Sequence, residues 1–225
     1  MNGLIVSVSV LDHLLAFLLL AIIPARALWR SRPNAVASEP KAIRYLTTIG
    51  MMAGLLSILA ADWLLAGRTV KALGLGPPTT TPAQVGLGLV TMLLSVLRLV
   101  LRRKSAATRA NVEAARKELM PETLKERRLF LLFILAAGFG WEILYRGYLL
   151  YYLQPHVGLW GAVAVAALAY GVAHGFKSPR QVSGSIAAAL AFTIGYAATG
   201  SLWWLMLLHS GLPLLSMPAN KTEKG

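Results

Sequence analysis

Three ionisable groups within apolar stretches of the sequence could together carry out acid–base chemistry. Glu142, His174 and His209 lie in three different apolar runs. A carboxylate near two imidazoles can activate a water molecule or bind a metal ion, and it can also relay protons in a transporter. A charge inside a bilayer costs about 2.5–3.5 kcal/mol on insertion scales, so each such group is a functional hypothesis by default.

Glu142 is the strongest of these candidates. It lies about halfway along its run and is the only acidic residue between Glu126 and Glu223. Arg146 follows at i+4 on the same helical face, in the Glu-first order that favours pairing. A structural ion pair is therefore the alternative to a catalytic carboxylate. Each histidine alone is weaker evidence, because an interfacial position would explain His174 and a buried histidine such as His209 needs only a polar partner.

The other ionisable groups of the apolar runs have structural interpretations. Asp62 and Arg98 fit interfacial positions near the ends of their runs, where a long basic side chain can reach the membrane surface. Nothing nearby gives Asp12 or His13 a chemical role. His156 is interpreted as a loop histidine in a turn.

The composition indicates a membrane protein that must place these groups on separate spans. Of 225 residues, 56% are hydrophobic and only 14% are charged, whereas a soluble domain has about 25% charged residues. The predicted fold is an all-α polytopic bundle of about seven spans, each near the roughly 20 residues that a bilayer core requires. The spans cover residues 4–25, 45–66, 83–101, 129–153, 158–174, 184–199 and 201–217. The last two are short and meet at Gly200, so a broken pair or a re-entrant arrangement is also compatible with them.

The chain divides into four predicted regions. Residues 1–101 form an N-terminal three-span region, 129–217 form a four-span core with the candidate site, and 218–225 form a tail. Residues 102–128 are rich in Ala, Glu, Arg and Lys, which predicts a cytoplasmic or interfacial helix up to about Met120, interrupted at Pro121. Small residues in the fifth and sixth spans predict close helix packing.

The net charge of +13 reflects membrane topology. Of the 22 Lys and Arg residues, 18 lie in alternate loops and the tail, and few lie in the intervening loops. Basic loops stay in the cytoplasm, so the N-terminus is predicted outside and the C-terminus in the cytoplasm. The basic residues follow no groove-sized face, which argues against nucleic acid as a partner. The absence of Cys excludes disulfides, thiolate metal sites and a cysteine nucleophile.

The three apolar runs with candidate residues contain the segments GWEILYRGYLL at 140–150, YGVAHG at 170–175 and LLHSGLPLL at 207–215. These three motifs resemble those of the CPBP (CAAX-processing and bacteriocin-processing, or Abi) family of intramembrane proteases. The family pattern is EExxxRG, then an aromatic residue four before a histidine, then HxxxN or HxxxD. The segment PETLKERR also resembles the family's lead-in helix. The resemblance covers roughly 120–217.

The resemblance implies hydrolysis of a peptide bond near the C-terminus of a membrane-anchored or prenylated CAAX-like substrate. By that resemblance Glu142 activates water, His174 and His209 stabilise the oxyanion or assist proton transfer, and Arg146 orients Glu142, with Tyr170 as the aromatic of the second motif. It also implies an integral protein of a prokaryotic cell membrane, with the lipid bilayer and a membrane-anchored peptide as partners.

Two positions depart from the family pattern. Trp141 stands where the first glutamate is expected, and Pro213 stands where Asn or Asp is expected. A catalytically degenerate scaffold or immunity protein is therefore the first alternative, and a proton-coupled transporter is the second. The cofactor is open between none and a divalent metal such as zinc. Glu142, His174 and His209 match a zinc ligand count, but their spacing is not that of the helical HExxH motif.

Overall fold

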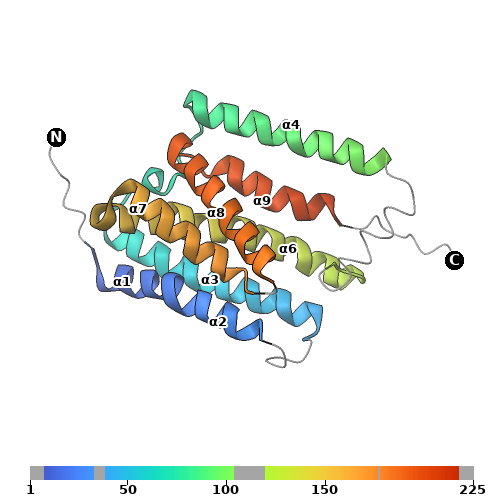
Figure 1. Ribbon diagram of the computed structural model, residues 1–225, viewed down its shortest axis with the longest axis horizontal. Coiled ribbons are helices and arrows are strands. Elements are labelled where there is room, and N and C mark those ends of the chain that lie inside the picture. The colour runs from blue at the N-terminus through green and yellow to red at the C-terminus, as the bar shows by residue number, and fades with distance from the viewer. Residues whose placement is uncertain (1–7, 33–38, 104–119, 177, 218–225) are drawn as a thin grey trace.

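A computed structural model describes the chain except for residues 1–7, 33–38, 104–119, 177 and 218–225. The described residues form a bundle of helices joined by turns, with no strand among them (Figure 1). The predicted all-α fold is thereby confirmed. The elements are α1 (Val10–Phe17), η1 (Leu18–Ile22), α2 (Ile23–Arg30), α3 (Lys41–Leu65), η2 (Val70–Leu73), α4 (Thr81–Arg103), α6 (Leu124–Trp141), η3 (Glu142–Tyr148), α7 (Leu149–Ala173), α8 (Pro179–Thr199) and α9 (Trp203–Leu215).

Five helical stretches in the described part are long and apolar enough to cross a membrane. The first is Val10–Arg30, in which α1, η1 and α2 run on without a break, and the next two are α3 and α4. The fourth is Leu124–Ala173 and the fifth is α8. The last helix, α9, is apolar but has only 13 residues. The chain is therefore a polytopic helical membrane protein.

The fourth stretch has the length of two spans. Its 50 residues would extend about 75 Å as one straight helix, more than twice the roughly 30 Å of a bilayer core. Gly158 breaks the helix with φ +71°, a conformation that only glycine adopts readily. In Figure 1 the chain turns back on itself within α7. This break lies next to the turn predicted between the runs 129–153 and 158–174.

The motif-bearing span begins earlier than its apolar run. The predicted start was residue 129, but α6 starts at Leu124. Thr123 accepts a hydrogen bond from the backbone N–H of Glu126, and the Glu126 carboxylate accepts from the N–H of Thr123. This capping box fixes the helix start in a charged segment that a hydropathy pattern does not mark. The helix predicted up to Met120 lies almost entirely outside the described residues.

Small residues allow the C-terminal helices to pack closely. A methyl group on Gly171 would lie 2.7 Å from the Cα of Ile186, so α7 and α8 approach each other nearly backbone to backbone. Gly138 on α6 meets Ser210 on α9 just as tightly. Without a hydrophobic driving force between membrane helices, such close contact is what holds them together. The predicted close packing of the small-residue spans is found at α7 and α8.

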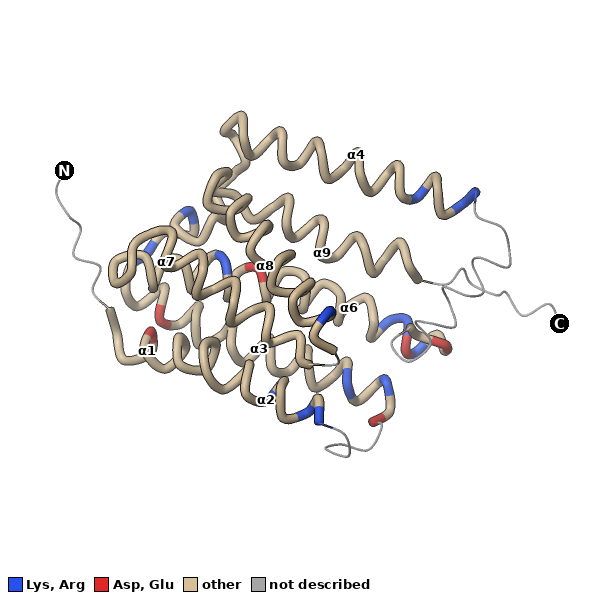
Figure 2. The backbone as a smooth tube through the Cα atoms, in the orientation of Figure 1, with Lys and Arg blue, Asp and Glu red and all other residues tan. Residues whose placement is uncertain are grey.

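Most described Lys and Arg residues lie at one end of the bundle. Figure 2 shows this end where α2 and α4 finish and α3 and α6 begin, whereas the opposite end carries Arg68 and Lys71 between α3 and α4. This distribution fits the charge bias from which a cytoplasmic basic end was predicted. The orientation of the chain in the membrane, like the four-region division, stays a prediction.

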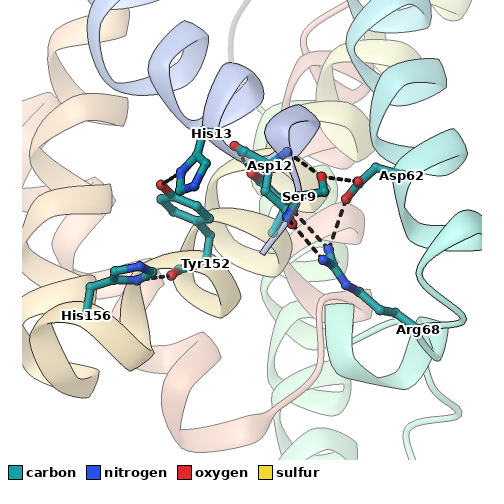
Figure 3. Close-up of polar contacts among 8 residues, drawn as sticks. Ser9, Asp12, His13, Asp62, Arg68, Tyr152 and His156 are labelled. Atoms are coloured by element: carbon teal, nitrogen blue, oxygen red, sulfur yellow. Dashed lines mark hydrogen bonds and ion pairs between the residues drawn. The ribbon is translucent and has the colours of Figure 1, made fainter. Parts of the chain in front are cut away.

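A buried ion cluster ties the first helix to the rest of the bundle at that opposite end. Arg68 Nη2 lies 2.6 Å from an Asp12 oxygen, and Arg68 Nη1 lies 3.0 Å from an Asp62 oxygen (Figure 3). Ser9 donates a hydrogen bond to Asp62, and the Arg68 guanidinium lies 5.1 Å from the ring centre of Trp63. The hydrogen bonds to Asp12 raise the pKa of Arg68 above its ordinary value. We call these residues, Ser9, Asp12, Asp62 and Arg68, the α1 clamp.

The clamp gives partners to groups for which the sequence suggested none. The sequence suggested no role for Asp12 and an interfacial position for Asp62. Both carboxylates are buried, and both form ion pairs with Arg68. His13 also has a partner, since its Nδ1 lies 2.7 Å from the hydroxyl of Tyr152 (Figure 3). His156 Nδ1 lies 2.9 Å from the carbonyl of the same tyrosine.

Candidate active site

The helix that carries Glu142 changes from α to π winding at that residue. The π segment η3 covers Glu142–Tyr148, so it contains the whole ExxxRG motif. Such turns are rare and occur frequently at functional sites. Tyr145 donates a hydrogen bond to the carbonyl of Leu19 at 2.8 Å, and Tyr148 donates to that of Asp12 at 2.6 Å. The segment is therefore anchored to the first helix from inside the core.

The surroundings of Gly147 explain why the ExxxRG motif ends in glycine. A methyl group there would lie 2.7 Å from the backbone carbonyl oxygen of Leu73 in η2. A backbone atom cannot move aside as a flexible side chain can. Only glycine therefore lets η3 approach the loop between α3 and α4 this closely.

Glu142 and Arg146 form an ion pair inside the bundle. Arg146 Nη1 lies 2.7 Å from each carboxylate oxygen of Glu142, and the two residues are only 1% and 2% exposed respectively. The guanidinium also lies 4.7 Å from the ring centre of Tyr170. The structural pairing expected from the spacing is thus present. A buried pair of this kind needs further hydrogen bonds to balance the cost of desolvation.

His209 supplies such a bond from another helix. Its Nδ1 lies 2.9 Å from Oε1 of Glu142. The close contact of Gly138 on α6 with Ser210 on α9 holds α9 near enough for this bond. A carboxylate paired with arginine is an acceptor only, so the hydrogen of neutral His209 sits on Nδ1. The Nε2 atom then carries a free lone pair. This is the arrangement in which a histidine accepts a proton.

His174 and Tyr170 complete the polar wall. His174 follows the last residue of α7, and its Nδ1 lies 2.9 Å from the carbonyl oxygen of Tyr170. Nδ1 is therefore the donor, and Nε2 is again the free acceptor. The Tyr170 hydroxyl lies 3.5 Å from Nδ1 of His209, which is at the limit of a hydrogen bond.

These side chains line one cavity of about 500 Å³. Glu142, His174 and His209, which the sequence singled out, are all on its wall together with Arg146 and Tyr170. Helix α8 packs on α7, and α9 packs on α4 and α6, so the cavity lies between the two helices that follow His174. Its remaining lining is mostly apolar, as in pockets that bind organic ligands. The lining from these two helices is Arg180, Gln181, Gly184, Ser185, Ala188, Ala189, Phe192, Leu205, Leu208, Leu212 and Pro213.

The two positions that depart from the family pattern, Trp141 and Pro213, both line a neighbouring cavity. Trp141 lines a second cavity of about 400 Å³, which His174, His209 and Pro213 also line. Trp141 does not line the first cavity. A carboxylate at position 141, where the pattern places one, would therefore line this second cavity together with both histidines.

Glu142, His174 and His209 do not form a metal site in the described part of the structure. Within the described part of the chain, no group of three His, Cys, Asp or Glu residues gathers closely enough to hold a metal ion. Both carboxylate oxygens of Glu142 are already held by Arg146, and His209 uses Nδ1 on one of them. The suggested ligand set of Glu142, His174 and His209 thus does not fit a metal in this arrangement.

Sequence reasoning missed two features of this region. Arg180 was counted only as a loop charge, although it is the second residue of α8 and lines the cavity. Phe192 lines it too and lies 5.9 Å from the Arg146 guanidinium. Phe192 and Arg146 lie 46 positions apart in the sequence, so spacing along the chain carries no sign of their contact.

Together, the helices and the cavity define a polytopic membrane protein with a candidate acid–base site inside its bundle. Residues 124–215 match the family model described as type II CAAX prenyl endopeptidase Rce1-like. Comparison with curated proteins and with solved structures found no match. The family predicted from the three motifs is confirmed by this match, which covers residues 124–215 and contains all three motifs.

Proposed function

We propose that the protein is a membrane endopeptidase that hydrolyses a peptide bond of a membrane-anchored substrate, such as a prenylated peptide. The observation that carries this proposal is the contact of 2.9 Å between Glu142 and His209 on the wall of the cavity. A carboxylate that holds the Nδ1–H of a histidine fixes its tautomer and stabilises its charged form. The family match over the same residues supports this activity.

The proposed reaction uses His209 Nε2 as the proton acceptor and Glu142 as its partner. The water oxygen attacks the peptide carbonyl carbon while its proton moves to Nε2 of His209. The resulting imidazolium is paired with Glu142, and it returns the proton to the leaving nitrogen as the C–N bond breaks. The products are a carboxylic acid and an amine. Glu142 thereby takes part in water activation through His209, with Arg146 holding its carboxylate in place.

His174, which lines the same cavity, is proposed to assist. Its Nδ1–H is engaged with the Tyr170 carbonyl, so the neutral ring offers only Nε2 to a substrate. In this form it accepts a proton or a hydrogen bond from water. Once protonated, it donates to the oxyanion of the tetrahedral intermediate.

Substrate is proposed to enter from the basic end of the bundle. His174 and Arg180 both line the cavity, and both are exposed where α7 ends and α8 begins. Arg180 belongs to the loop predicted to be cytoplasmic. A peptide chain that emerges from the membrane surface on that side can therefore reach the cavity while its lipid anchor stays in the bilayer.

A histidine substitution tests the proposal. The purified protein in vesicles is incubated with a broad panel of membrane-anchored peptides, and products are identified by mass. We expect His209→Ala to lower cleavage at least about 100-fold, since acid–base groups contribute about 10²–10⁴. His156→Ala is the matched control, because His156 is exposed and bonds only to the Tyr152 carbonyl. It should cleave like the wild type.

The outcomes separate the proposal from its alternatives. Absence of cleavage by the wild type across the whole panel, with peptide binding retained, would favour the scaffold function; Trp141 in place of the first glutamate is the observation that supports it. Proton-coupled uptake without product peptides would favour a transporter. Equal cleavage by the wild type and His209→Ala would overturn the site but not the activity.

A further inference from the structure

The charges of the cavity favour an anionic ligand. Its wall carries two arginines, Arg146 and Arg180, against the single carboxylate of Glu142. With both histidines neutral, these fixed charges sum to one positive charge. Glu142 is paired with Arg146, and no acidic side chain in the described residues forms an ion pair with Arg180. The unbalanced charge therefore belongs to Arg180.

The start of α8 adds to this positive potential. Ser178 caps the helix and accepts the N–H of Gln181, and Arg180 follows Pro179 in the first turn. The N-terminus of a helix carries a partial positive charge and favours anions. Gln181, Gly184 and Ser185 from the first two turns lie on the cavity wall.

An independent observation deeper in the same cavity points to a polar ligand. Arg146 is 1% exposed, and its Nε and Nη2 have no hydrogen-bond partner within the described residues. Buried donors are rarely left unsatisfied unless a ligand or water completes them. Arg146 and Arg180 line the same cavity, so a ligand that fills this cavity lies beside both arginines.

We infer that Arg180 binds the free C-terminal carboxylate of the peptide substrate and selects for it. Arg180 is exposed at the start of α8, whereas Glu142 is buried, and both residues line the same cavity. In this inference the carboxylate is held at the exposed start of α8, while an upstream peptide group reaches the Glu142–His209 pair. This inference rests on the proposed function, and it makes Arg180 a specificity-determining residue separate from the acid–base pair.

Two matched peptides test the inference in vesicles of neutral lipid. They share one lipid anchor and one sequence, and they end in a free carboxylate or in an amide. Binding and the KM of cleavage are measured for the wild type, Arg180→Gln and Arg180→Lys. We expect the wild type to bind the acid roughly tenfold more tightly than the amide, as for one charge-assisted hydrogen bond near a surface. Arg180→Gln should lose this preference with amide binding unchanged, and Arg180→Lys should keep part of it.

Arg98→Gln provides the control, because it removes an exposed arginine near the same end of the bundle but outside the cavity. Its preference should equal that of the wild type. Equal binding of acid and amide by the wild type would overturn the inference. A preference that appears only with anionic lipid, and that Arg180→Gln removes, would make Arg180 a lipid contact and overturn it as well. Selective binding without cleavage would instead contradict the proposed proteolysis, and cleavage without selectivity would contradict only the role of Arg180.

Discussion

Glu142→Gln is expected to lower peptide cleavage at least about 100-fold while the protein still folds. The amide has nearly the same shape, but it cannot stabilise the imidazolium that forms when His209 accepts the water proton. It also places an NH₂ group where Arg146 now donates to both carboxylate oxygens. One of the facing donors then lacks an acceptor, so the position of His209 loosens as well.

The measurement is the initial rate of product formation in vesicles at equal protein density, with folding checked by thermal unfolding in detergent. Glu122→Gln is the matched control, since Glu122 forms an exposed ion pair with Lys41. That variant should cleave at the wild-type rate. Cleavage by Glu142→Gln at a rate within twofold of the wild-type rate would show that Glu142 takes no part in the reaction. Its ion pair with Arg146 would then be purely structural.

Arg68→Met is expected to destabilise the protein by about 3–5 kcal/mol. The substitution leaves Asp12 and Asp62 buried without their shared countercharge, although methionine fills much of the same space. Both carboxylates then repel each other inside the bundle. The first helix should loosen from the core, because the α1 clamp connects Asp12 to the loop after α3.

Reversible unfolding in mixed micelles measures this loss. Lys71→Met is the control, since Lys71 lies exposed in the same loop and should change stability by less than about 0.5 kcal/mol. Adding Asp12→Asn and Asp62→Asn to Arg68→Met should recover part of the stability by removing the uncompensated charges. An Arg68→Met protein as stable as the wild type would show that the clamp contributes nothing to holding the first helix.

The sequence was sufficient to predict most of the spans and the candidate residues that the structure brings to one cavity. Apolar length identified most spans, and the lone carboxylate of the C-terminal core pointed to Glu142. The Glu142–Arg146 contact follows from helical spacing alone, because residues four apart share a face. These features depend on local order along the chain.

The features that the sequence did not reveal depend on contacts between distant segments. Asp12 and Arg68 are separated by 56 positions, so neither a hydropathy window nor a helical period relates them. The bond from His209 to Glu142 arises because α9 lies against α6 at Gly138 and Ser210. Trp141 and Glu142 are consecutive residues, so their side chains leave the helix about 100° apart, which explains why Trp141 lines a different cavity from Glu142.

The most direct test of the central claim is the fate of the water oxygen. Cleavage of a membrane-anchored peptide in ¹⁸O-labelled water is followed by the mass of the newly formed carboxyl group, with the wild type and Glu142→Gln compared in one preparation. We predict that the wild-type product gains one ¹⁸O atom per cleaved bond and that the Glu142→Gln sample contains almost no labelled product. Labelled product formed equally by both proteins, or cleavage without label, would contradict water activation by the Glu142–His209 pair.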